Sequence, residues 1–209
     1  MVEFTSLDVV ATALGSLAGG WYLWTNHWAA NNLFGVCFSI EGIEMLSLGS
    51  WKNGAILLVG LFFYDIFWVF GTDVMVTVAK GFDGPIKLLF PNPNPEERHS
   101  LLGLGDIVVP GIFVALMLRF DVSLSPTRTL QNCNQTHFKG QVVAYASALA
   151  VTLCSMYFFD AAQPALLYLV PACLGASLLT TVATGQFKEL WAYEEGGEGE
   201  ESKAAKKTD

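Results

Sequence analysis

The chain has 209 residues, of which 53% are hydrophobic and only 14% are charged, well below the roughly 25% that is usual for soluble domains. This composition excludes a large soluble domain and indicates a membrane protein, with lipid as its first partner. The net charge of −8, with only 11 Lys and Arg residues, leaves no basic patch for phosphate groups, so nucleic acid is excluded as a partner.

Six apolar runs approach the roughly 20 residues that a transmembrane helix requires. They predict an all-α, polytopic transmembrane helix bundle of about six spans over residues 1–190. The Glu, Gly and Lys-rich residues 191–209 are expected to form a disordered acidic tail. In chain order the runs are Leu7–Trp24, Ala29–Leu48, Gly54 to a point between Phe70 and Ala79, Leu101–Phe120, Val142–Phe159 and Pro164–Ala183.

The first two spans carry residues that predict contacts between helices. Gly15 and Gly19 form a GxxxG pattern, which favours close packing against another helix. Glu41 and Glu44 are three residues apart and therefore share one helical face. Because charge is costly in lipid, this face is expected to point into the bundle.

The connections between spans predict the orientation. With six spans, eight of the eleven Lys and Arg residues fall on the side that holds both ends, so the positive-inside rule places both termini in the cytosol. Asn134 of the Asn-Gln-Thr sequon would then lie in the cytosol and carry no glycan. The Lys80–Ser100 connection contains spaced prolines and is expected to be an extended linker. Met1–Phe4 has no basic residue, so no cleaved leader is expected.

The third span contains a single carboxylate, Asp65, inside the apolar run Leu61–Phe70. A charge near the centre of a bilayer costs at least ~2.5–3.5 kcal/mol, so such a residue is a candidate for function. A buried carboxyl group that is kept neutral by packing is the alternative.

The fourth span supplies a partner for it. Asp106 follows Gly103 and Gly105, and Pro110 lies four residues later. Pro110 has no N–H to donate to the carbonyl of Asp106, so the helix is weakened where the carboxylate emerges. Irregular backbone at membrane depth is tolerated only where protein or water satisfies it, which predicts a hydrated pocket at Asp106.

Two carboxyl groups close together in a site of low dielectric lose their protons in two separate steps. One can then activate water while the other protonates a carbonyl oxygen, as in aspartic proteases, with no metal or cofactor. At a helical rise of ~1.5 Å per residue, Asp65 and Asp106 reach the same depth only if the third helix ends near Gly71–Asp73. We therefore expect the helix to end there.

Three short motifs, Tyr64-Asp65, Gly103-Leu104-Gly105-Asp106 and Gln163-Pro164-Ala165-Leu166, resemble the YD, GxGD and PAL signatures of presenilin-type intramembrane aspartyl proteases. The signal peptide peptidase branch is the most similar, since Asn31–Gly35 and Tyr168–Cys173 resemble it as well. The resemblance extends to about residue 195 and implies that Asp65 and Asp106 are catalytic. The residues that it implies in substrate positioning are Tyr64, Gly103, Gly105, Gln163, Pro164, Ala165 and Leu166.

The residues alone support simpler roles for two of these positions. Pro164 is typical of the first turn of a helix, where proline is common. Tyr64 either donates a hydrogen bond near the two acids or packs against other aromatic rings.

The resemblance implies an intramembrane aspartic endopeptidase that cuts transmembrane peptides, such as remnant signal peptides and type II membrane segments, in the endoplasmic reticulum. Transmembrane peptides are the implied partners, and a homo-oligomer is left open. Family members resemble nine-span proteins, and the six spans expected here correspond to the last six. Lys206 and Lys207, fourth and third from the end, look like a dilysine retrieval signal.

Two other functions fit the sequence. One is a proton-coupled transporter or channel that uses the four acids of the second, third and fourth spans as a relay. The other is an inactive, truncated remnant that binds membrane helices. A metalloprotease is not expected because there is no HExxH motif, and a serine protease is not expected because all histidines fall in connections.

Overall fold

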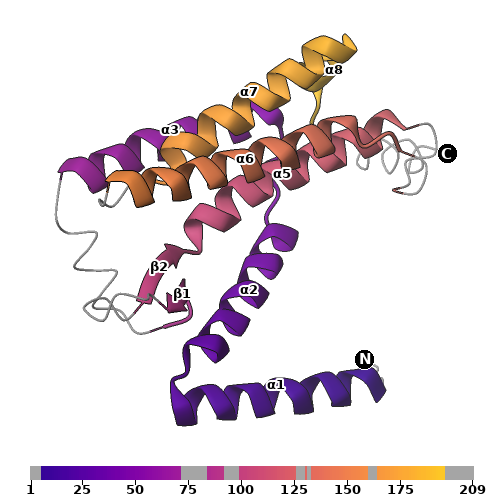
Figure 1. Cartoon of the computed structure of the whole chain (residues 1–209). Helices are drawn as coiled ribbons and strands as arrows, with labels where there is room; N and C mark the ends of the chain where they lie inside the picture. The colour runs from indigo at the N-terminus through magenta and orange to yellow at the C-terminus, as the bar shows by residue number, and fades with distance from the viewer. Residues whose placement is uncertain are drawn as a thin grey trace.

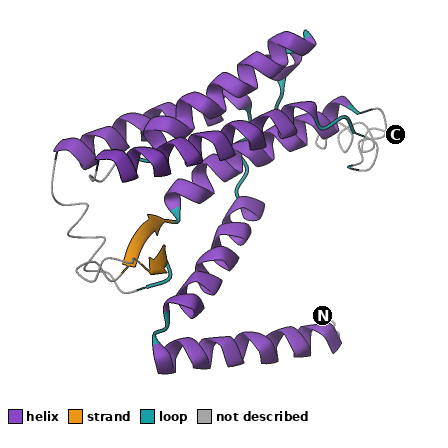
Figure 2. Ribbon diagram, viewed as in Figure 1, coloured by secondary structure: helices purple, strands orange, loops and turns teal. Residues whose placement is uncertain are grey.

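The computed structural model describes residues 6–71, 84–91, 99–125, 130, 133–159 and 164–195 (Figure 1). These residues form helices and one two-stranded sheet (Figure 2). The helices are α1 (Ser6–Thr25), α2 (Trp28–Met45), α3 (Trp51–Gly71), α5 (Gly105–Leu124), α6 (Thr136–Phe159), α7 (Leu166–Thr184) and α8 (Phe187–Ala192), and the strands are β1 (Lys87–Pro91) and β2 (His99–Gly103).

Each predicted span overlaps one of the six long helices. Three of these, α3, α5 and α7, are long and apolar enough by length and composition to cross a membrane. The third predicted helix was expected to end near Gly71–Asp73, and α3 is described as far as Gly71, where the described segment stops. Asp73 itself lies outside the described residues.

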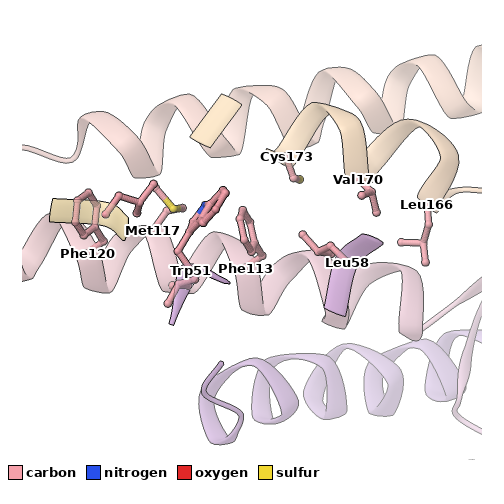
Figure 3. Close-up of a cluster of buried hydrophobic side chains, with 10 residues drawn as sticks. Trp51, Leu58, Phe113, Met117, Phe120, Leu166, Val170 and Cys173 are labelled. Carbon is pink, nitrogen blue, oxygen red and sulfur yellow. The ribbon is translucent and has the colours of Figure 1, made fainter. Parts of the chain in front are cut away.

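The core lies where α3, α5, α6 and α7 run side by side (Figure 1). Figure 3 shows its side chains in a row between the helices, from Phe120 at one end to Leu166 at the other. Lipid tails are as apolar as these side chains, so the hydrophobic effect does not drive membrane helices together. Close packing of side chains holds them together instead. The buried residues of the row are Trp51, Leu58, Phe113, Leu116, Met117, Phe120, Leu166, Val170, Cys173 and Leu190.

Helix α1 stands apart from this bundle and contacts α2 (Figure 1). None of its residues is buried. A Cβ atom added at Gly15 or Gly19 would meet nothing within 4 Å. The helix that the GxxxG pattern was expected to contact is therefore not found in the described part of the chain.

Helix α2 packs on α5 and on β1, but not through its acidic face. Its buried residues, Asn31, Gly35 and Ser39 among them, follow one another at four-residue intervals and form a single stripe. Glu41 and Glu44 lie off this stripe and are exposed. The prediction that they point into the bundle is therefore wrong for the described residues.

The fourth predicted span begins too early. Residues 101–103 belong to β2, which pairs antiparallel with β1 in the register Leu89 to Leu101 and Lys87 to Gly103. Helix α5 therefore starts at Gly105, and the connection predicted as an extended linker contains a strand of a hairpin. Glycine is a poor helix former, and the Gly-Leu-Gly-Asp motif contains two glycines. A helix that continues back through this motif is therefore disfavoured, and the motif separates β2 from α5.

The chain also remains ordered beyond the predicted start of the tail at residue 191. Trp191 of α8 lies against Trp51, with ring centroids 5.9 Å apart. Glu195 pairs with Arg119 at 2.9 Å and its N–H donates to the carbonyl of Gly49. The prediction of disorder is therefore wrong for residues 191–195, because composition does not reveal the partners of Trp191 and Glu195, and the rest of the predicted tail lies outside the described residues.

Candidate active site

Asp65 lies near the C-terminal end of α3 and is buried, with 5% of its surface exposed. Its Oδ2 accepts a hydrogen bond of 3.1 Å from the backbone N–H of Leu166. Leu166 is the first residue of α7 and the last of the Pro-Ala-Leu motif. Two motifs that are 101 residues apart in sequence therefore meet directly.

The start of α7 explains why this N–H is available. The first N–H groups of a helix have no acceptor within the helix. Ala165, just before α7, has helical backbone angles, and both Pro164 and Ala165 are buried. Their carbonyls accept the N–H groups of Leu167 and Leu169 at 3.2 Å. The Leu166 N–H is thus left to bind a carboxylate, which the positive end of the helix dipole also favours.

Asp106 is the second residue of α5, and the carbonyl of Leu104 closes the first turn of that helix. It accepts the N–H groups of Ile107 and Val108 at 3.1 and 2.8 Å. The Asp106 carboxyl interacts electrostatically with that of Asp65. A Cβ atom on Gly103 would lie 3.5 Å from Asp106 Oδ2, so the end of β2 runs alongside this carboxyl group.

The structure therefore brings the three motifs to one end of the bundle. This is where α3 ends and α5 and α7 begin, with the hairpin leading into α5 (Figure 1). Two interacting carboxyl groups next to exposed glycine backbone can activate water against a peptide placed beside them.

Two predicted positioning residues contact neither carboxyl group in the described structure. The Tyr64 side chain is 60% exposed and its ring lies 5.9 Å from that of Trp68, which agrees with the packing alternative. Gly105 is exposed, and an added Cβ would meet nothing within 4 Å. Gln163, Lys206 and Lys207 lie outside the described residues.

Sequence reasoning did not single out Tyr145 of α6, a half-buried residue whose ring packs against the core. The residue has no recognisable motif around it. Helix α6 also carries other polar side chains, Gln141 and Ser147 among them, so the hydroxyl of Tyr145 gave no distinct signal.

The relay of four acids is not assembled in the described residues, since Glu41 and Glu44 are exposed on α2 while Asp65 is buried. The histidines with described side chains also lie elsewhere. His27 accepts a hydrogen bond from Ala29 N–H at the start of α2, and His137 pairs with Asp121.

Comparison with known proteins gives matches over nearly the whole chain. A family model described as "Signal peptide peptidase" matches residues 1–196. A mouse protein named signal peptide peptidase is 52% identical over 198 residues, which cover 92% of this chain and 51% of the mouse protein. Intramembrane protease 2 of Caenorhabditis elegans is 48% identical over 100% of this chain and 47% of its own length. A probable intramembrane protease of Schizosaccharomyces pombe is 42% identical over 94% of this chain and 67% of its own length. The chain thus spans about half the length of the mouse and worm relatives.

Proposed function

Because the chain belongs to the signal peptide peptidase family, we propose that it contributes both catalytic carboxylates of an intramembrane aspartic endopeptidase. It is a multi-pass membrane protein. The observation that carries the proposal is the hydrogen bond between the Asp65 carboxylate and the Leu166 N–H, at the end of the bundle where Asp106 lies in the first turn of α5.

The reaction follows from a pair of carboxyl groups that share one proton. The ionised group takes a proton from water, and the oxygen of that water attacks the scissile carbonyl carbon. The protonated group gives its proton to the carbonyl oxygen, which yields a neutral tetrahedral diol. Transfer of a proton to the nitrogen then breaks the C–N bond and releases a carboxylic acid and an amine.

The substrates proposed are transmembrane peptides, such as remnant signal peptides and type II membrane segments. A helix hides its carbonyls in backbone hydrogen bonds, so the segment to be cut has to be extended first. The strand β2 ends beside Asp106, and no further strand pairs with it in the described part of the sheet. An extended segment could therefore add to β2 and place its carbonyl groups near the two acids.

We also propose residence in the endoplasmic reticulum with both ends of this chain in the cytosol. The supports are Lys206 and Lys207 near the C-terminus and the distribution of Lys and Arg. Protease protection of tagged ends in microsomes tests the orientation, and a glycan on Asn134 would contradict it.

The activity is tested by reconstituting the chain in lipid vesicles with a signal-peptide substrate and identifying the products by mass spectrometry. We expect cleavage within the apolar segment that is abolished by Asp65→Ala and by Asp106→Ala. Glu189→Ala, which removes an exposed acid of α8, serves as the matched control and should cleave normally. Cleavage that persists in either aspartate variant would contradict the assignment. Binding of the peptide without any cleavage would instead support a helix-binding remnant.

A further inference from the structure

The outer edge of β1 is bonded to side chains of α2. Asn32 Nδ2 donates to the carbonyl of Leu89 at 2.8 Å, and Asn32 Oδ1 accepts the N–H of the same residue at 2.7 Å. Asn31 Nδ2 donates to the carbonyl of Lys87 at 2.7 Å. The two adjacent amides thus bind β1 as a neighbouring strand would.

The register of the hairpin shows which edge this is. The N–H of Leu104 donates to the carbonyl of Ile86, which makes that pair hydrogen-bonded across the hairpin. In an antiparallel ladder, hydrogen-bonded and non-hydrogen-bonded pairs alternate. Lys87 and Leu89 therefore point their backbone groups away from β2, toward the two asparagines.

The same alternation assigns the other edge. Leu101 and Gly103 are the partners of Leu89 and Lys87, so their backbone N–H and C=O groups point outward from β2. Gly103 also runs alongside the Asp106 carboxyl group. Among the described strands, the edge that remains open is thus the one nearest to Asp106.

Helix α2 also fixes the hairpin relative to the acid. Half-buried Gly42 follows the last residue of its buried stripe by three positions, and an added Cβ there would lie 3.4 Å from Val108 of α5. At Gly35 an added Cβ would lie 2.8 Å from the side chain of Leu88, so α2 and β1 are in close contact. One rigid element therefore contacts both β1 and the helix that carries Asp106.

We propose that Asn31 and Asn32 are positioning residues for proteolysis, which close the outer edge of β1 and so direct an extended substrate to β2. This inference rests on the proposed protease function. An open sheet edge is not tolerated in lipid, so each edge of the hairpin must be satisfied by protein, peptide or water. The asparagines hydrogen-bond the outer edge of β1, and the outer edge of β2 is left for the substrate.

The test compares Asn32→Leu and Asn31→Leu with wild type in the same vesicles. Leucine keeps the approximate size of asparagine and removes the amide. We expect KM to rise roughly tenfold for Asn32→Leu, the cost of losing about two hydrogen bonds, while kcat changes little. The cleavage position should also spread over neighbouring bonds. Asn32→Gln, which keeps the amide, should recover part of the loss.

A second readout does not depend on activity. Hydrogen exchange followed by mass spectrometry over residues 84–104 should be faster in Asn32→Leu and Asn31→Leu than in wild type. Asn53→Leu is the matched control, since Asn53 is an exposed asparagine at the start of α3, and it should change neither KM nor exchange.

Unchanged KM together with unchanged exchange in both leucine variants would overturn the proposal, as would an equal rise of KM in Asn53→Leu. If the wild type shows no cleavage that depends on Asp65, the proposed function fails. In that case the exchange measurement alone decides whether the asparagines hold the hairpin. Equal exchange in wild type and both leucine variants would then refute the inference.

Discussion

A buried carboxylate lies toward each end of the helix bundle, and the two differ in the number of hydrogen bonds that they accept. At one end, Asp65 accepts a single hydrogen bond in the described structure, from Leu166 N–H. At the other end, Asp121 accepts the N–H of Phe138 at 2.8 Å and both the N–H and the Nδ1 of His137, at 3.4 and 2.6 Å. Both acids are almost completely buried.

The difference shows which acid is structural and which is available for chemistry. A buried charge is stabilised when several hydrogen bonds satisfy it, and Asp121 accepts three by capping the start of α6 and holding a histidine. His137 in turn contacts Thr184 Oγ1 of α7 at 3.1 Å, so this network joins three helices. Asp65 keeps acceptor positions open, and water or a substrate can occupy them.

The largest effect that tests this comparison comes from the two acids of the candidate active site. We expect Asp65→Asn and Asp106→Asn each to lower the cleavage rate by about 10³-fold or more, while the protein stays folded. The double variant should be no slower than either single one, because the two groups act as a unit. Initial rates of product formation in vesicles measure this, and losses that multiply would contradict a shared mechanism.

The next effect concerns stability at the opposite end. Asp121→Ala should lower the free energy of unfolding by about 3 kcal/mol, because it leaves the buried His137 and two N–H groups without an acceptor. Thermal unfolding in detergent measures the loss. Cleavage per folded molecule should stay within a factor of two or so, since such positions act through stability. An equal loss of catalysis would remove the distinction between the two ends.

A smaller effect is expected at a buried hydrogen bond within the core. Trp51 Nε1 donates to Ser177 Oγ at 3.2 Å between buried residues. Ser177→Ala should therefore cost about 1–2 kcal/mol, the usual penalty for a buried donor without an acceptor. Ser147→Ala, at an exposed position of α6, is the control and should leave Tm unchanged. Equal shifts of Tm in the two variants would argue against this hydrogen bond.

The smallest effect concerns Glu195, whose partner Arg119 is partly exposed. Glu195→Gln should cost at most about 1 kcal/mol, and the difference from wild type should disappear at high salt. Tm measured at low and high ionic strength tests both statements. A loss that persists in high salt would mean that the pair is less accessible to ions than its exposure indicates.

The sequence predicts those residues of the site that belong to short local motifs. Asp65 and Asp106 were predicted as site residues because a charge in an apolar run is costly and because glycines and Pro110 surround the second acid. The end expected for α3, near Gly71–Asp73, coincides with the end of the described segment and stays a prediction, and it was derived for a fourth helix that begins at Leu101, where the structure has β2.

The errors fall where tertiary contacts outweigh composition. Glu41 and Glu44 were predicted to point into the bundle because a charge in lipid is costly. The stripe of small residues on α2 decides instead which face of the helix is buried. The hairpin was missed because its strands are held partly by the side chains of Asn31 and Asn32, which no local pattern of β1 or β2 reveals. Tyr145 likewise gave no distinct signal, because α6 carries several other polar side chains.

The hydrogen bond between Leu166 and Asp65 also has a consequence for biosynthesis. Its two residues are 101 positions apart, and a ribosome adds roughly 5–20 residues per second. Asp65 is therefore made about 5–20 s before the N–H that binds it, on the same rate of synthesis. Throughout that interval the emerging chain holds the acid without its partner from α7. Among the described long helices α7 comes last in the chain, so the candidate active site cannot be complete before α7 has been made.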